Sequence, residues 1–197
     1  YIADYPILGT IAQINAFALG AQMTNPRAKV YLEWSTLKDQ DIEKRIDEID
    51  PNCISGKDII VPDDNNHFYG VYHRESGGGE QKNLAMPLCH WGKFYEELIR
   101  TIMAGNWEQD NDVEKAINYW WGMPTGVVDV ICSKKLPAGT VRLVNVLKHN
   151  YKTGQFHTFT DQMYAQGHVL KEKKGETLSP EEVIEMDWLA ENIIGRI

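Results

Sequence analysis

The sequence lacks long apolar runs and an excess of basic residues. No stretch approaches the roughly 18 apolar residues that a membrane-spanning helix needs. The 197 residues include 20 basic and 28 acidic ones, for a net charge of −8. Because nucleic-acid binding requires a basic face, we expect no nucleic-acid partner and no attraction to an anionic membrane. There is no initiator methionine before the strand-like Tyr1-Ile2-Ala3, so we expect an N-terminus cut from something longer.

Motifs for metal binding and hydrolysis are also missing. The three cysteines, Cys53, Cys89 and Cys132, form no C-x-x-C pair, and the six histidines form no H-x-H or H-x-x-x-H. There is no G-x-S-x-G turn for a nucleophilic serine. We therefore expect no metal, no cofactor, no catalytic residue and no enzymatic activity. Each cysteine follows or lies in an apolar run, which predicts buried free thiols and fits a reducing compartment.

What is present is an alternation of strand and helix patterns, which predicts an α/β fold with a mainly parallel sheet. A glycine-rich stretch at residues 76–82 is the best candidate for a boundary. It has two interpretations, a mobile tip and a phosphate-binding loop, and its spacing matches neither nucleotide-binding pattern. The expected helices cover residues 7–23, 39–49, 91–103, 137–151 and 179–195. The expected strands cover residues 1–5, 28–34, 58–61, 68–72 and 83–86, and two more lie within residues 116–132.

Two of these elements carry sharper local signals. Ser179, Pro180 and Glu182 form a helix start in which the serine and glutamate side chains satisfy free backbone donors. The stretch around Pro87 predicts a turn between a strand and a helix that begins near Trp91. Ligands of open α/β sheets bind where strands end and helices begin.

Aromatic and polar residues at such junctions are the candidate ligand contacts. Trp91 opens a helix directly after a strand, with His90 before it, and its flat ring could stack on a planar ligand. Tyr72, His73 and Arg74 lie at the end of a predicted strand and could add hydrogen bonds. A surface ion pair is the alternative for Arg74. Core packing is the alternative for each tryptophan, including the others singled out, Trp34, Trp120 and Trp121.

Several stretches, in order, resemble the basic membrane protein family, whose members are purine-nucleoside receptors of ABC transporters. Those stretches are Tyr5-Pro6-Ile7 with Ile14-Asn15-Ala16-Phe17-Ala18-Leu19-Gly20-Ala21 and Asn25-Pro26, Gly70-Val71-Tyr72-His73-Arg74-Glu75, Trp91-Gly92-Lys93-Phe94-Tyr95, Tyr119-Trp120-Trp121-Gly122 with Gly126-Val127-Val128-Asp129, and the C-terminal residues 178–195 with Met186-Asp187-Trp188. The resemblance spans nearly the whole chain.

The resemblance implies a type I periplasmic-binding-protein fold, with residues 1–82 as the second lobe. Residues 83–197 would hold the hinge crossing, the returning part of an incomplete first lobe, and a C-terminal helix. It also implies a solute-binding protein for a nucleoside or nucleobase, with Pro6 among its ligand contacts. Such a protein would be extracytoplasmic, anchored through a missing N-terminus, and partnered with an ABC permease.

A second function remains open: a ligand-sensing regulatory domain of a larger intracellular protein. Three features motivate it. The cysteine count is odd, Arg74 stands near a position that is acidic in nucleoside-binding members, and the interval between Trp34 and Gly70 is shorter than the family pattern.

Overall fold

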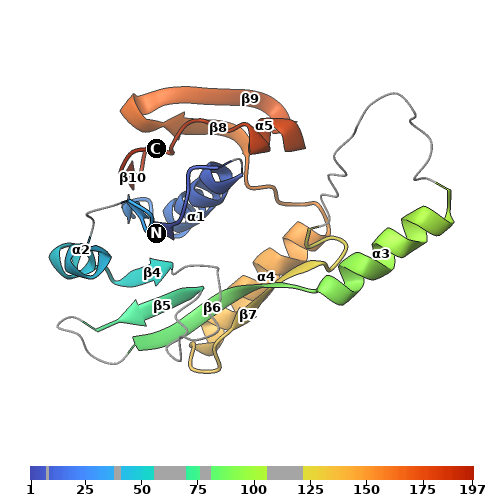
Figure 1. The fold of residues 1–197 in the computed structure, drawn as a ribbon, viewed down its shortest axis with the longest axis horizontal. Helices are drawn as coiled ribbons and strands as arrows, with labels where there is room; N and C mark the ends of the chain where they lie inside the picture. Colours follow the sequence, from blue (N-terminus) through green and yellow to red (C-terminus); the bar gives the residue numbers. More distant parts are fainter. Residues whose placement is uncertain (8, 38–40, 56–69, 76–80, 106–121) are drawn as a thin grey trace. The chain divides into compact units, whose positions relative to one another are not determined.

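The computed structural model describes residues 1–7, 9–37, 41–55, 70–75, 81–105 and 122–197 (Figure 1). The chain forms two compact units. The first unit comprises residues 1–84 and 157–197, and the second comprises residues 85–156. The predicted strand at 58–61, the loop at 76–80 and residues 116–121, including Trp120 and Trp121, lie outside the described residues.

Parallel strands form the centre of the first unit. Strands β2 (Val30–Tyr31) and β3 (Glu33–Trp34) follow one another, in place of the single strand predicted for residues 28–34. Strand β1 (Ile2–Ala3) pairs in parallel with β3, and β10 (Ile193–Ile194), from the far end of the chain, pairs in parallel with β2. Gly195, the residue after β10, lies against Leu32, since a Cβ at Gly195 would stand only 2.8 Å from the Leu32 Cβ. Residues distant in sequence thus build two small parallel sheets of two strands each.

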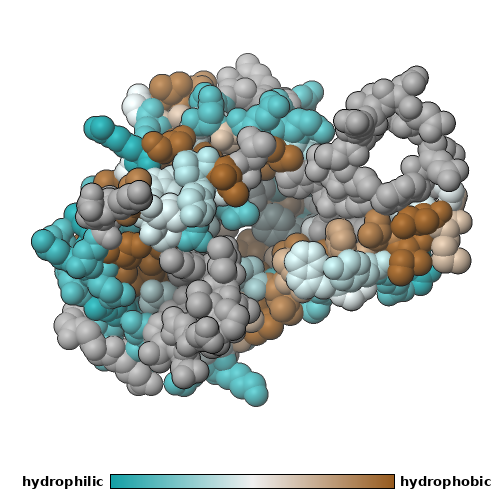
Figure 2. Space-filling model, in the orientation of Figure 1, coloured by the Kyte–Doolittle hydropathy of each residue, from teal (hydrophilic) through white to brown (hydrophobic). Residues whose placement is uncertain are grey.

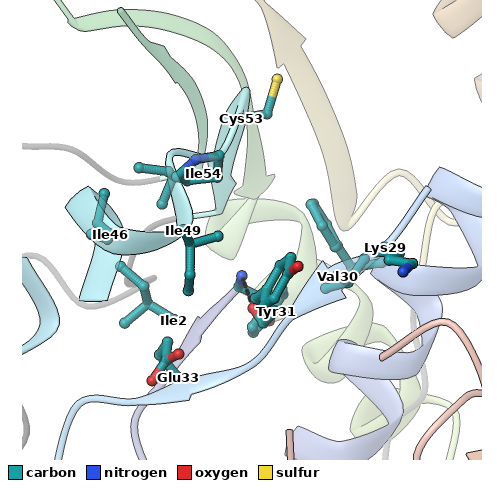
Figure 3. A pocket seen from close by; sticks show the side chains of 12 residues that line it. Ile2, Lys29, Val30, Tyr31, Glu33, Ile46, Ile49, Cys53 and Ile54 are labelled. Carbon is teal, nitrogen blue, oxygen red and sulfur yellow. Dashed lines mark hydrogen bonds between the residues drawn. The ribbon is translucent and has the colours of Figure 1, made fainter. Parts of the chain in front are cut away.

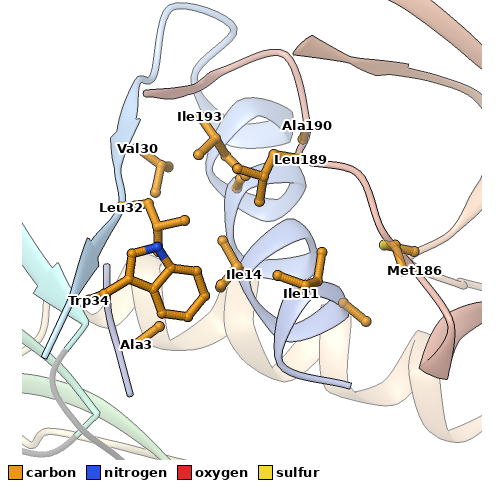
Figure 4. Close-up of a cluster of buried hydrophobic side chains, with 12 residues drawn as sticks. Ala3, Ile11, Ile14, Val30, Leu32, Trp34, Met186, Leu189, Ala190 and Ile193 are labelled. Carbon is orange, nitrogen blue, oxygen red and sulfur yellow. The ribbon is translucent and has the colours of Figure 1, made fainter. Parts of the chain in front are cut away.

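Helix α1 (Thr10–Thr24) packs on these strands and closes the main hydrophobic core. Its residues Ile11, Ile14 and Ala18 are buried, as the helical spacing predicts. Val30, Leu32 and Trp34 meet them from the strands, confirming the predicted alternation (Figure 4). The prediction was wrong at the start of the helix. Ile7, expected on the buried face, is exposed because α1 begins only after Gly9, whose φ of 84° is left-handed.

The C-terminal segment contains the largest error of the sequence prediction. The capping box of Ser179 and Glu182 is confirmed, but α5 spans only Pro180–Ile184. Residues after it run extended, and they bond to other parts of the chain instead of to their own helix. The Gln166 amide donates to the Leu189 carbonyl at 2.9 Å, and the Glu191 amide donates to the Tyr164 carbonyl at 2.8 Å. Tertiary contacts therefore override the helical pattern of this segment.

A smaller apolar cluster lies elsewhere in the first unit. It joins α2 (Ile42–Ile49) to the antiparallel pair β4 (Cys53–Ser55) and β5 (Val71–Arg74) through Ile46, Ile54 and Tyr72. Strands β8 (Thr160–Ala165) and β9 (Val169–Thr177) form an antiparallel hairpin around the short helix η1 (Gln166–His168). The described strands therefore pair in both senses, and parallel pairing does not dominate as predicted.

In the second unit, β6 (Gln81–Cys89), which enters from the first, pairs antiparallel with β7 (Val128–Cys132). The turn predicted at Pro87 is wrong, since Pro87 lies within β6 opposite Val130. Proline is tolerated in a strand where its missing N–H is not needed for the ladder. Helix α3 (Trp91–Met103) has the predicted bounds, and α4 (Ala138–Lys152) follows β7 closely as expected after Pro137.

An ion pair fastens α4 to β7. The Lys148 Nζ lies 2.6 Å from the Asp129 Oδ1 and donates to the Val130 carbonyl at 3.0 Å. The hydrogen bond from Lys148, followed by one from the Val130 amide, lowers the pKa of the Asp129 carboxyl below its usual value. Both side chains are about three-quarters or more buried, so solvent screens this pair less than an exposed one.

We expect the contribution of this pair to depend on pH. Because the folded pKa of Asp129 is lowered, the stabilisation is present above the unfolded value of about 4 and is lost as pH falls through the folded pKa. The urea midpoint of Asp129→Asn should lie below that of the wild type at pH 7, and the gap should shrink in acid. The exposed Lys135→Met serves as the control for charge removal. A gap that does not change with pH would contradict this role.

Candidate functional site

Polar side chains gather at the carboxyl ends of the parallel strands β1 and β3. The Ser35 hydroxyl donates to the Asp4 carboxylate, and the Thr36 hydroxyl donates to the Asp4 carbonyl. In parallel α/β sheets, loops and helix N-termini meet at this edge and hold ligands. The edge in the first unit is therefore the candidate site.

The loop from β1 to α1 supplies the rest of this edge. Tyr5 is 58% exposed, Pro6 is exposed, and the Ile7 amide turns back to donate to the Tyr5 carbonyl at 2.8 Å. This edge thus carries the exposed Tyr5 ring, next in sequence to Asp4, whose carboxylate and carbonyl accept the Ser35 and Thr36 hydroxyl groups. A small polar ligand with a planar part needs both a flat apolar group and polar groups.

A pocket in the same unit lies at the opposite ends of the strands (Figure 3). It is lined by residues at the amino ends of β1 and β2, with Ile46, Ile49 and Ile54 facing them. Its volume of about 80 Å³ is far below the roughly 300 Å³ of a small ligand site. Its buried carboxylate, Glu33, is already paired with Arg45 at 3.1 Å. We interpret this pocket as a packing gap between α2 and the sheet.

Three of the predicted contact residues follow one another on β5, in the first unit. Tyr72 is buried in the smaller cluster, where desolvation raises the pKa of its hydroxyl. The His73 Nδ1 lies 2.6 Å from the Asn52 carbonyl oxygen, and Arg74 forms the ion pair that was its alternative reading. Its guanidinium lies 2.8 Å from Asp47 and 3.8 Å from Glu43, both on α2.

Of the other three predicted contacts, Pro6 lies in the first unit, in the loop after β1, and His90 and Trp91 belong to the second unit. The His90 amide donates to the Val127 carbonyl at 2.7 Å and so fixes the start of α3. The Trp91 ring is 61% exposed and forms edge contacts with Phe94, with ring centroids 5.8 Å apart. An indole exposed at a helix N-terminus is available for stacking.

Sequence reasoning missed Asp4, Ser35 and Thr36. Asp4 lies near the end of the strand predicted for residues 1–5, and Ser35 and Thr36 are the first two residues after the strand predicted for 28–34, which is the signal that could have found them. Trp34, proposed among the stacking rings, instead lies in the core and donates its indole N–H to the Arg196 carbonyl at 2.7 Å.

The cysteines differ from their prediction. All three are free thiols, but Cys53 and Cys89 are exposed and Cys132 is half-buried. Cys53 begins β4 and Cys89 ends β6, so both stand where a strand meets solvent. Within the described residues, no three His, Cys, Asp or Glu side chains are grouped to hold a metal ion. Over the same residues, no helix combines the length and apolarity of a membrane span.

Comparison with known proteins gives two relatives. The chain is 25% identical over 199 residues to a purine-binding protein of Brucella abortus, covering 95% of this chain and 55% of that protein. It is 30% identical over 139 residues to a protein of Haloferax volcanii named as an ABC transporter glucose-binding protein, covering 64% of this chain and 34% of that protein. No family model matches.

Both relatives are binding proteins. The chain is therefore similar to two proteins whose names describe binding and not catalysis. The mixed α/β structure is compatible with a binding-protein fold. The chain spans about half the length of one relative and about a third of the other.

Proposed function

We propose that this chain is part of a solute-binding protein that delivers a nucleoside or nucleobase to an ABC permease. The observation that carries the proposal is the similarity to a purine-binding protein over 95% of the chain. The carboxyl ends of β1 and β3 support it, since they present an exposed aromatic ring beside hydrogen-bonding groups. The resemblance to the basic membrane protein family points the same way, and with it to a type I binding-protein fold.

Each unit has its own proposed contact residues. In the first unit these are Pro6 with its neighbour Tyr5, and His73 with Arg74, whose strand is anchored by the buried Tyr72. In the second unit they are His90 and Trp91. We propose an extracytoplasmic location, with attachment to the plasma membrane through sequence upstream of Tyr1.

A ligand-sensing domain inside a larger intracellular protein is the second candidate. The three free thiols favour it, because unpaired cysteines fit a reducing compartment. A secretory signal upstream of Tyr1 in the gene would exclude this candidate and leave the transport function.

A thermal-shift panel tests the proposed ligand class. We expect purine bases and nucleosides to raise the melting temperature of the full-length protein. A ligand present at 100 times its dissociation constant adds about 2.7 kcal/mol to the free energy of unfolding, which raises the melting temperature by several degrees. Glucose and amino acids are the comparison ligands. A shift with glucose alone would move the ligand class to sugars, and no shift with any compound would reject the proposal.

Trp91 is the residue whose proposed contact is easiest to test. If its exposed ring stacks on the ligand, Trp91→Ala should weaken binding by about 1–3 kcal/mol, in the range measured for base–aromatic stacking. The matched control is Ile102→Ala, a partly exposed apolar residue near the other end of α3. Equal dissociation constants for the wild type and Trp91→Ala would remove Trp91 from the site.

A further inference from the structure

Stacking contacts of the kind proposed for Trp91 do not by themselves select a ligand. Trp91 and Tyr95 on α3 are 61% and 57% exposed, and Figure 2 shows hydrophobic side chains gathered over the part of α3 near its C-terminal end. Every nucleobase has an apolar face, so an aromatic ring accepts one base much as it accepts another. Selectivity comes from polar groups whose hydrogen bonds the wrong ligand cannot make. A selecting contact therefore requires a polar group that the fold holds in place.

Asp4 follows a buried pair of strand residues in the first unit. Ala3 and Trp34 are partners in the parallel ladder of β1 and β3, and they are only 4% and 7% exposed. The Ser35 amide donates to the Ala3 carbonyl at 2.7 Å, which continues the ladder by one step. Asp4 and Ser35 are therefore the first residues beyond two anchored strands, at their carboxyl ends.

Two hydroxyl groups orient Asp4. Ser35 donates to its carboxylate, and Thr36 donates to its main-chain carbonyl. Asp4 and Ser35 are half-buried and Thr36 is exposed, so this group of residues reaches the surface from a buried base. A side chain fixed in this way loses little freedom when a ligand binds, which makes its contact both stronger and more exacting.

A carboxylate selects by the direction of the hydrogen bond. An ionised carboxylate accepts hydrogen bonds and cannot donate them, and its two oxygens offer about four acceptor sites. The Ser35 hydroxyl uses one of these sites on Asp4. A ligand group that meets this carboxylate must therefore be a donor, because an acceptor or an anionic group would be repelled. The N–H groups of a base and the O–H groups of a sugar are such donors.

We propose that Asp4 selects among ligands by accepting a hydrogen bond from them, and that Ser35 and Thr36 are positioning residues for this contact. This inference rests on the proposed function, and it adds the class of group that the ligand must present. That group is an uncharged N–H or O–H donor, carried by the base or by the sugar.

Calorimetric titration with nucleoside analogues tests the contact. In the full-length protein, Asp4→Ala should lower the affinity for the tightest-binding of adenosine, guanosine and inosine by about tenfold or more. Purine riboside lacks the N–H donors of the base, and the 2′-, 3′- and 5′-deoxy forms each lack one sugar hydroxyl. For the analogue that lacks the donor bound by Asp4, the same substitution should change the affinity by less than about twofold. That analogue shows whether the donor lies on the base or on the sugar.

Three further variants serve as controls. Asp187→Ala removes an exposed aspartate of the C-terminal segment and should leave every affinity unchanged. Asp4→Asn keeps the size of the side chain and an oxygen for Ser35, so it tests the contact even if Asp4→Ala folds poorly. Ser35→Ala should weaken binding of the parent nucleoside less than Asp4→Ala does, and Ser35→Thr, which keeps the hydroxyl, should restore it.

The outcomes separate this inference from the function on which it rests. Equal losses for every analogue would show that Asp4 acts on the fold and not on the ligand, and an unchanged affinity for the parent nucleoside would remove Asp4 from the site. Either result would overturn the inference while nucleoside binding itself stands. The absence of binding of any nucleoside or base to the folded wild type would reject both.

Discussion

Replacing Asn15 with leucine is expected to lower the free energy of unfolding by about 3 kcal/mol or more. Asn15 is fully buried in α1 and holds the extended C-terminal segment. Its amide donates to the Trp188 carbonyl at 2.7 Å, and its carbonyl oxygen accepts from the Ala190 amide at 2.8 Å. Leucine would leave both backbone groups buried without partners, and each such group costs about 1–3 kcal/mol.

The matched control for this variant is Gln13→Leu. Gln13 lies two residues earlier in α1, is exposed, and should tolerate leucine with a change within about 0.5 kcal/mol. Denaturant unfolding of both variants measures the difference. If Asn15→Leu were as stable as Gln13→Leu, the C-terminal segment would not depend on α1 as the structure indicates.

Replacing Trp34 with alanine is expected to destabilise the first unit by about 3–5 kcal/mol, as for other large buried aromatic residues. The Trp34 side chain is buried between Leu32, Ala3 and α1, and its indole N–H is bonded to the Arg196 carbonyl (Figure 4). Its ring therefore serves the core, in contrast to the ligand-stacking role that the sequence left open for it.

Trp91→Ala is the matched comparison, since Trp91 is an exposed tryptophan of the same chain. It should change the unfolding free energy little while weakening ligand binding. Unfolding curves of the two tryptophan variants, followed by circular dichroism, separate the roles. A Trp34→Ala protein as stable as the wild type would show that the main core does not depend on this side chain.

Local signals in the sequence were sufficient for some elements. The bounds of α3 and the capping box at Ser179 were predicted correctly, because helix periodicity and capping chemistry act within a few residues. The buried alternation of Val30, Leu32 and Trp34 was likewise readable from the strand pattern.

Non-local interactions explain the failures. The predicted C-terminal helix stops at Ile184 because Asn15, about 170 positions away, bonds to the residues that follow it. Pro87 signalled a turn, yet pairing with β7 carries the strand through it. A rule based on residue spacing within one element cannot identify either distant partner, Asn15 or β7.

The same distinction between local signals and non-local interactions applies to the candidate site. The principle that ligands bind at the carboxyl ends of parallel strands could have found Asp4, Ser35 and Thr36 from the sequence. It could not show that Tyr72 is buried or that Arg74 pairs with Asp47 on α2, because both depend on how α2 packs against β5.

Calorimetric titration of the full-length protein with purine bases and nucleosides tests the central proposal most directly. We expect binding of one ligand per chain, with a dissociation constant in the micromolar range or tighter, and weaker binding to Trp91→Ala than to the Ile102→Ala control. The titrations would be performed with folded protein at two temperatures. The absence of any heat of binding for every base and nucleoside would contradict a nucleoside- or nucleobase-binding function.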